Sequence, residues 1–323
     1  MTSVPDAVRL ESISGRHVGG RRITVSDQPV DEVALSSALP AYHHDPNDAY
    51  HIEQAYVQRF VPAERAQRTP VLLVHGGGMT GACWETTPDG RPGWLWAFLR
   101  AGLQVEVLDN VERGRAGWCS LPGVWQSEPI LRGERDMWVT FRVGTAEGYE
   151  TRTPFPGSRF PVGVLESMLR QSVPRWPANG ELAARALLDV VDDIGPCVLV
   201  GHSQGGGLCA RVAAERPSIV RALVMIEPHG LPPLAAVPAG YPPGLTVLGD
   251  YVPYSPMWIR LVEEIRRHST LIRQSGALAD VLDLPARGIH GNSHNPMMDT
   301  NSDQVADLLL EWLAARRADG AFD

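Results

Sequence analysis

The segment CVLVGHSQGGG, residues 197–207, has the composition of a nucleophilic serine site. Its apolar half predicts a buried strand, and its glycine-rich half predicts a tight turn into a helix. Gly201 and Gly205 flank Ser203 at the positions where the strand and helix backbones crowd each other. Such a turn lifts the serine hydroxyl clear of the sheet, and the helix directs its first amides at developing negative charge. The pattern therefore predicts a nucleophile at Ser203 rather than an ordinary turn residue.

A serine nucleophile needs a histidine base and an acidic residue that orients the base. In folds with this type of turn, the three residues follow the order serine, acid, histidine along the chain. The segment GIHGNSHNPMMD, residues 288–299, supplies His290 and His294. His294 is favoured because it lies farther from the preceding strand, in a polar loop that can fold back over the sheet edge. His290 is the alternative base, and we otherwise expect it to support that loop by hydrogen bonding.

Two acidic residues compete for the orienting role, and each ends a predicted strand. Asp250 closes LTVLGD, residues 245–250, which is the commoner position of the acid in folds of this type. Glu227 closes VRALVMIE, residues 220–227, on the strand after the helix that follows Ser203. A glutamate at the end of a mostly apolar run is unusual for an ordinary surface residue. The residues alone leave both acids open.

Acyl-transfer chemistry also needs backbone amides that stabilise an oxyanion. The amide of Gln204, directly after the serine, is the first expected donor. The glycines of HGGG, residues 75–78, follow another predicted strand and let backbone amides approach a substrate oxygen closely. Gly77 is the first choice for the second donor, and Gly78 is the alternative.

Alternating strands and helices are expected to position these residues. Apolar runs typical of buried strands occur at 69–78, 103–110, 197–201, 220–227 and 245–250. Helical periodicity occurs between them and after them, at 93–102, 180–195, 204–215 and 302–318. This alternation predicts an α/β fold with a mostly parallel central sheet of about eight strands, covered by helices on both faces. Near the N-terminus, residues 7–25 alternate around Gly19-Gly20 and predict a hairpin.

Residues 118–178 break the alternation and predict a cap inserted into a single domain of residues 1–323. The stretch leaves from the carboxyl end of a strand, where open α/β sheets place their sites. The candidates for the substrate pocket are side chains in or near the cap and near the nucleophile: Met79, Trp84, Trp118, Trp138 and His202. The competing interpretation is that the aromatic residues of the cap fill its own core.

Composition argues against several other functions. The chain has 323 residues, of which 44% are hydrophobic, and a net charge of −8. It has no basic stripe for nucleic acid, no apolar run long enough for a membrane span and no signal-peptide pattern. Four scattered cysteines lack metal-ligand spacing, although a Cys83–Cys119 disulfide stays open. We therefore expect a cytoplasmic protein without cofactor, metal, nucleic-acid or membrane partners, and base rates favour a homodimer.

The motifs HGGG and GHSQGG, together with the late histidine, resemble the α/β-hydrolase superfamily. A closer resemblance is carried by HGGGMTGACWETTPDGRPGW (75–94), VMIEPHG (224–230) and GIHGNSHNPMMD (288–299). These segments are similar to a branch of bacterial carboxylesterases of the esterase 713 type. The resemblance implies a catalytic triad of Ser203, Glu227 and His294, with Asp250 in a supporting position.

The expected function is that of a serine carboxylic-ester hydrolase, which acts through an acyl-enzyme on small to medium esters. The aromatic residues of the cap favour apolar or aromatic substituents on the small-molecule substrate. A lactonase or a thioesterase with the same triad is an alternative. A non-catalytic ligand-binding homologue is a further alternative, because fold alone does not fix function.

Overall fold

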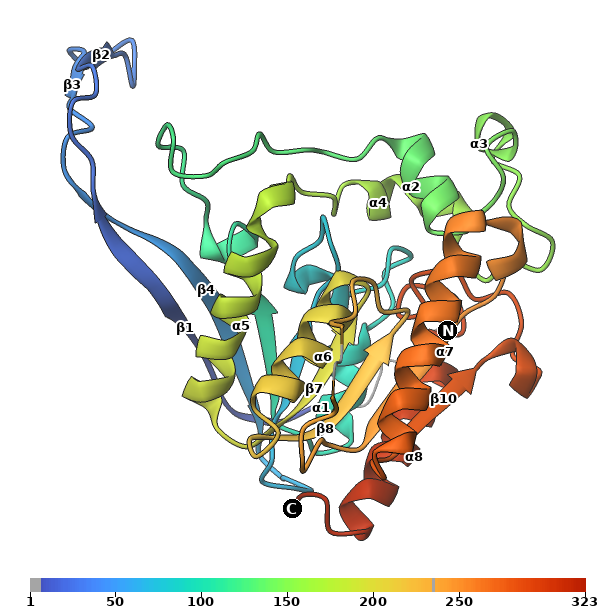
Figure 1. Cartoon of the computed structure of the whole chain (residues 1–323). Helices are drawn as coiled ribbons and strands as arrows, with labels where there is room; N and C mark the ends of the chain where they lie inside the picture. Colours follow the sequence, from blue (N-terminus) through green and yellow to red (C-terminus); the bar gives the residue numbers. More distant parts are fainter. Residues whose placement is uncertain (1–6, 234–235) are drawn as a thin grey trace.

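The computed structural model describes residues 7–233 and 236–323 and is built around one eight-stranded sheet (Figure 1). The strand order is β1-β4-β6-β5-β7-β8-β9-β10. The strands are β1 (Leu10–Thr24), β4 (Ala49–Pro62), β5 (Val71–Val74), β6 (Val105–Asp109), β7 (Cys197–His202), β8 (Val220–Ile226), β9 (Gly244–Leu248) and β10 (Ala279–Asp283). The pairs from β6 to β10 are parallel, and β4 pairs antiparallel with both β1 and β6. The predicted α/β fold with a mostly parallel sheet is confirmed.

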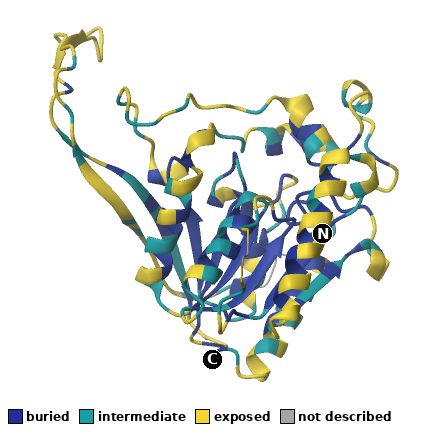
Figure 2. Ribbon diagram, viewed as in Figure 1, coloured by how far each residue is buried: buried dark blue, intermediate teal, exposed yellow. Residues whose placement is uncertain are grey.

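Helices cover both faces of this sheet, which explains why its central strands are mostly apolar. Val71 and Leu73 of β5 pack on the side of α1 (Trp94–Arg100) and α8 (Ser302–Ala318). Leu72 and Val74 of the same strand pack on the side of α5 (Gly180–Ile194) and α6 (Gln204–Glu215). On that second side, α7 (Pro256–Gln274) covers the far end of the sheet, where it packs on β9 and β10. Figure 2 shows the central strands as the buried centre of the molecule, whereas the edge strand β1 is mostly exposed.

The prediction of a hairpin at Gly19-Gly20 is wrong, because β1 continues through these glycines and pairs with β4 on both sides of them. Both glycines have positive φ, +69° and +82°, and a Cβ on Gly20 would lie 2.6 Å from the Ile52 carbonyl oxygen. They therefore provide a backbone bend and a close approach within a long strand rather than a turn.

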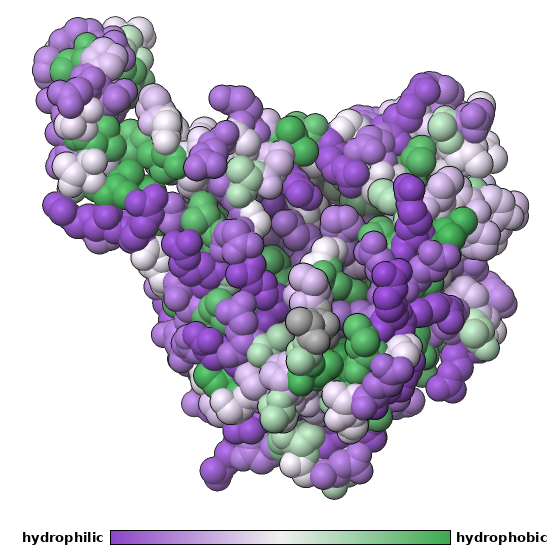
Figure 3. Space-filling model, viewed as in Figure 1, coloured by the Kyte–Doolittle hydropathy of each residue, from purple (hydrophilic) through white to green (hydrophobic). Residues whose placement is uncertain are grey.

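Beyond the sheet, β1 and β4 lead into an arm, residues 25–48, which ends in the small pair β2 (Asp31–Val33) and β3 (Tyr42–His44) (Figure 1). Its side chains are mostly exposed, including the apolar Leu35 and Leu39. Figure 3 shows hydrophobic and hydrophilic residues side by side on this projecting part.

Residues 118–178, here called the cap segment, cross over the carboxyl ends of the parallel strands (Figure 1). The segment contains no named strand, and its α-helices are short: α2 (Glu134–Thr140), α3 (Gly148–Thr151) and α4 (Leu165–Leu169). A pair of backbone hydrogen bonds between Ile130 and Arg175 ties its two halves together. Its function as a cap stays a prediction at this point.

All four cysteines are free thiols, so the disulfide left open between Cys83 and Cys119 is not formed. Burial raises the pKa of the Cys83 thiol well above its ordinary value, which keeps it protonated and unreactive. None of the described helices has the length and apolar composition that a membrane span requires.

Candidate active site

Ser203 occupies a strained turn between β7 and α6, with φ 52° and ψ −119°. A residue other than glycine holds a positive φ only where its surroundings enforce it, and such strain concentrates at functional sites. The surroundings are tight, because a Cβ on Gly201 would lie 2.6 Å from the Gly205 carbonyl oxygen. A Cβ on Gly205 would lie 2.5 Å from the His75 carbonyl oxygen. The glycines flanking the serine are therefore required by close backbone contact, as the sequence pattern predicts.

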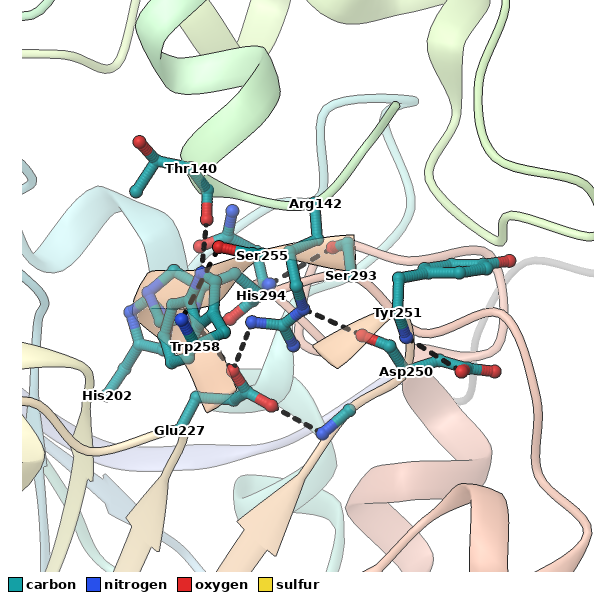
Figure 4. A network of polar contacts seen from close by, with 12 residues as sticks. Thr140, Arg142, His202, Glu227, Asp250, Tyr251, Ser255, Trp258, Ser293 and His294 are labelled. Carbon is teal, nitrogen blue, oxygen red and sulfur yellow. Dashed lines mark hydrogen bonds and ion pairs between the residues drawn. The ribbon is translucent and has the colours of Figure 1, made fainter. Parts of the chain in front are cut away.

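His294 and Glu227 form a buried pair close to this turn (Figure 4). The distance from His294 Nδ1 to Glu227 Oε2 is 3.2 Å, and the two side chains are 2% and 0% exposed. Glu227 follows β8 and has a positive φ of 49°, so the chain bends where the carboxylate leaves the sheet. Since Nδ1 faces the carboxylate, Nε2 is the ring nitrogen left for another partner, and His294 lines the same cavity as Ser203.

Arg142, from the cap segment, is the third charged group of this buried cluster. Its Nη1 lies 2.8 Å from Glu227 Oε2, and its Nε donates a hydrogen bond of 2.7 Å to the Asp250 carbonyl oxygen. The second oxygen of Glu227 accepts a 2.5 Å hydrogen bond from the Gly249 amide. The guanidinium also lies 4.3 Å from the centre of the Trp258 ring, a favourable cation–π distance. Glu227 is thus held from three sides.

These contacts set the protonation states of the pair. Burial would raise the pKa of Glu227, but the Arg142 guanidinium and the hydrogen bond from His294 outweigh it and lower the pKa to about 2. Burial lowers the pKa of His294 to about 4, although the partnership with Glu227 opposes this shift. At neutral pH the carboxylate is therefore charged and the imidazole is neutral, which are the states a general base and its orienting acid need.

Aromatic rings and backbone bonds hold the imidazole in place (Figure 4). The rings of Trp258, His202 and Phe141 have their centres 4.4, 4.6 and 5.5 Å from that of His294. The His294 amide donates to the Phe141 carbonyl oxygen at 2.8 Å, and His202 Nε2 donates to the His294 carbonyl oxygen at 2.9 Å. Burial, together with His294, holds the pKa of His202 well below its ordinary value. His202 therefore stays neutral and supports the loop of His294.

The alternative acid and the alternative base lie together, away from the Glu227–His294 pair. Asp250 Oδ2 is 3.5 Å from His290 Nδ1 and accepts a hydrogen bond from the Gly291 amide at 2.9 Å. The His290 side chain is 68% exposed, which is unsuited to a base aimed into a closed cavity. Asp250 and His290 therefore form a pair separate from Glu227 and His294, and the contacts of Asp250 support the loop that carries His294.

The loop that carries His294 contains a buried acid that the sequence analysis missed. Asp299 accepts hydrogen bonds from the Ser293 amide and hydroxyl, both 2.8 Å, and from Asn292 at 3.0 Å. Burial raises the pKa of Asp299 to about 7. These bonds fix the backbone on the N-terminal side of the histidine. The signal in the sequence was an aspartate that closes the apolar run PMM.

Gly77, the first choice for the second oxyanion donor, approaches the serine turn closely, as does its neighbour Gly76. A Cβ on Gly76 would lie 3.2 Å from Ser203 Cβ, and one on Gly77 would lie 3.0 Å from Gln204 Oε1. Gly77 and Gln204 line the same cavity as Ser203, whereas Gly78 is not part of that lining. The Gly78 carbonyl oxygen instead accepts a hydrogen bond from Val173 of the cap segment at 2.9 Å.

A cavity of about 210 Å³ brings the predicted site residues together. Its wall contains Ser203, Gln204, Gly77, His294, Met79 and His202, and the cap segment adds Ile130, Arg132, Thr140, Phe141 and Arg175. Within the described residues, no hydrogen bond joins the Ser203 hydroxyl to His294; the two side chains share the wall. A larger cavity of about 580 Å³ lies beside the start of β1 and the end of β4, and none of the predicted site residues lines it.

The three tryptophans expected in the pocket do not line this cavity. Trp84 is fully buried and packs on Trp94 with a ring distance of 5.8 Å. Trp138 is equally buried and donates its indole hydrogen to the Thr145 carbonyl oxygen. Trp118 is 59% exposed at the surface of the cap segment. The aromatic composition was therefore a poor guide, because two of the rings fill the core.

Sequence reasoning missed several residues of the site. Arg142, Arg132 and Arg175 lie in the irregular cap segment, where no periodicity shows which side a residue faces. Trp258 lies on α7 and reaches the histidine through a contact between distant segments. For Arg142, the apolar residues around it in WVTFRV were the available signal of a buried charge.

The chain is similar in sequence and fold to several known proteins. A family model described as the α/β hydrolase fold matches residues 193–247. A solved structure of a bacterial esterase superposes with a TM-score of 0.84 at 30% identity, covering 97% of this chain and 98% of that one. The probable secreted lipase phiG of a fungal species is 26% identical over 317 residues, covering 80% of this chain and 85% of the relative. Lipase LipV of Mycobacterium tuberculosis is 46% identical over 54 residues, 16% of this chain and 20% of the relative.

The charged cluster leads to a prediction that needs no substrate. In the Arg142→Gln variant, Glu227 loses its buried counter-charge, so the pKa of His294 should rise above its value in the unmodified protein. Breaking a buried ion pair should also lower the free energy of unfolding by about 3 to 5 kcal/mol. NMR titration of the histidines and urea denaturation measure the two effects, and Arg142→Lys is the matched control that keeps the charge. An unchanged His294 titration in Arg142→Gln would contradict the role given to Arg142.

Proposed function

Because the chain belongs to the α/β-hydrolase family, in its branch of bacterial esterases, we propose that it is a carboxylesterase with Ser203, His294 and Glu227 as its triad. The single observation that carries this proposal is the buried His294–Glu227 pair beside the strained serine turn. A histidine oriented by a carboxylate and sharing a cavity with a serine on such a turn is the arrangement of an activated nucleophile.

In the first step, the Ser203 hydroxyl attacks the ester carbonyl carbon while His294 Nε2 accepts its proton. The hydrogen bond between hydroxyl and imidazole is expected to form when substrate binds, since such bonds tighten in the Michaelis complex. Glu227 holds the tautomer with the proton on Nδ1 and stabilises the imidazolium that forms. The low pKa of Glu227 keeps this carboxylate charged throughout.

The tetrahedral intermediate carries its negative charge on the former carbonyl oxygen. We propose that the amides of Gln204 and Gly77 donate to this oxygen, since both residues line the cavity beside the nucleophile. The imidazolium then protonates the leaving alkoxide, which departs as the alcohol. Water attacks the acyl-enzyme by the same route, releases the acid and restores the serine.

The size of the cavity favours small esters. A volume of about 210 Å³ is below the usual range of pockets for drug-sized ligands. We propose that residues 118–178 act as a cap, because five of them contribute to the cavity wall: Ile130, Arg132, Thr140, Phe141 and Arg175. Homodimer formation and a cytoplasmic location stay predictions, and one fungal relative is named as secreted.

A panel of 4-nitrophenyl esters of increasing acyl length tests the proposal directly. Wild type should hydrolyse the short esters, and Ser203→Ala and His294→Ala should each lose activity by about 1,000-fold or more. Circular dichroism shows whether the variants are folded. Turnover of lactones or thioesters in preference to esters would move the assignment to those substrates, and a folded wild type without any turnover would favour a ligand-binding protein.

The pH dependence follows from the buried histidine. His294 acts as a base only when neutral, and burial lowers its pKa to about 4. The value of kcat/KM should therefore stay constant as the pH falls from 7 and decline only near pH 4, well below the ordinary histidine range. A decline of kcat/KM near pH 7 would contradict this prediction. If that decline disappeared in the Asp299→Asn variant, it would come from the titration of Asp299 in the loop that carries His294.

A further inference from the structure

Arg175 differs from the other arginines near the nucleophile because its charge faces the cavity without a partner. In the described part of the chain, no carboxylate oxygen lies within ion-pair distance of its guanidinium, and its buried Nε has no hydrogen-bond partner. Arg132, in the same wall, is paired with Asp136 at 2.8 Å. Arg113 is paired with Glu112 at 3.1 Å.

The neighbouring acid, Glu112, is already occupied. Its Oε1 accepts hydrogen bonds from Arg113 and from the Trp176 amide, and its Oε2 accepts one from Asn179 at 2.7 Å. Glu112 therefore attracts Arg175 only at longer range. Burial and the positive charge of Arg132 both lower the pKa of Arg175, so its surroundings disfavour the charged guanidinium. A guanidinium held in this way costs free energy until an anion pairs with it.

The backbone holds Arg175 next to the glycine loop that borders the nucleophile turn. Its amide and carbonyl both bond to Ile130, at 3.0 and 2.8 Å, so the residue is fixed within the cap segment. Its Nη1 lies 2.6 Å from the place that a Cβ on Gly77 would occupy. The guanidinium is thus beside the glycine loop and the nucleophile turn.

A second hollow opens on the other side of this arginine. It has a volume of about 520 Å³ and shares Arg175, Gln204 and His229 with the catalytic cavity. Its own arginine, Arg211, is paired with Glu181 and Glu215. Among the described residues, Arg175 is therefore a cation without an ion-pair partner that lies in the walls of both spaces, within reach of a group attached to the ester.

We propose that Arg175 binds an anionic group of the substrate, so that the preferred esters carry a carboxylate or a similar anion close to the scissile bond. This inference rests on the proposed function and names its substrate class. A planar guanidinium with free donors suits a carboxylate, which it can bind through two parallel hydrogen bonds. The chemistry of hydrolysis is unchanged, because the anion stays on the acyl or the alcohol part.

Two pairs of esters of matched shape test this preference. Monoethyl glutarate carries the anion on the acyl side, and ethyl 5-methylhexanoate replaces its carboxylate oxygens with methyl groups. Carboxymethyl butanoate carries the anion on the alcohol side, and isobutyl butanoate is its neutral match. In at least one pair, kcat/KM of wild type should be about 10- to 100-fold higher for the anionic ester, the range of a charged hydrogen bond. Added salt should reduce this preference.

Variants of Arg175 distinguish binding of the substrate anion from a role that affects all esters equally. Arg175→Gln should abolish the preference by lowering kcat/KM far more for the anionic ester than for its neutral match, while Arg175→Lys should keep part of the preference. Arg216→Gln removes a charge from a remote surface pair with Asp192 and should leave both rates as in wild type.

Equal rates of wild type on both members of each pair would overturn the inference while leaving the esterase assignment intact. An equal loss on anionic and neutral esters in Arg175→Gln would also overturn it, since that pattern belongs to oxyanion stabilisation or structural support. If wild type hydrolyses none of the four esters and is not labelled by a fluorophosphonate, the proposed function itself fails, and the inference fails with it.

Discussion

The buried ion pair between Arg142 and Glu227 is the interaction on which the site depends. A carboxylate withdrawn from water costs several kcal/mol unless a counter-charge and hydrogen bonds compensate it. Here Arg142, the Gly249 amide and His294 supply that compensation, so Glu227 stays ionised inside the protein. An ionised Glu227 in turn selects the tautomer and orientation of His294. Without the arginine, the buried Glu227–His294 pair would take up a proton at a higher pH, and the base would lose its neutral state there.

This ion pair also joins the cap segment to the catalytic end of the sheet. Arg142 comes from the cap segment, whereas Glu227 follows β8 and His294 lies in the loop after β10. The backbone of Phe141 bonds to His294, and the indole of Trp258 on α7 bonds to the Thr140 carbonyl oxygen (Figure 4). The stretch of residues 140–142 is therefore part of the catalytic framework, and the size of the cavity and the alignment of the base depend on the same contacts.

Sequence reasoning succeeded where the information was local. Unbroken apolar runs identified strands buried on both faces, and the glycines around Ser203 identified a turn whose backbone contacts exclude side chains. It failed where local patterns are ambiguous. Gly19 and Gly20 gave a turn signal but bend a continuous strand, and the tryptophans expected in the pocket lie in the core or on the surface. Arg142 could not be assigned from the sequence, because its partner Glu227 lies in a distant segment. In addition, an irregular segment has no periodicity from which the burial of a residue can be predicted.

The most direct test of the account is the rate at which a fluorophosphonate modifies Ser203, with the site of modification identified by peptide mass spectrometry. The account predicts that Glu227→Gln lowers this rate by about 1,000-fold or more, since the wrong histidine tautomer disables the base. Asp250→Asn is the matched control and should lower it by less than about tenfold, because its backbone carbonyl still holds Arg142. Circular dichroism shows that both variants are folded. A large loss in Asp250→Asn with a small loss in Glu227→Gln would contradict the account.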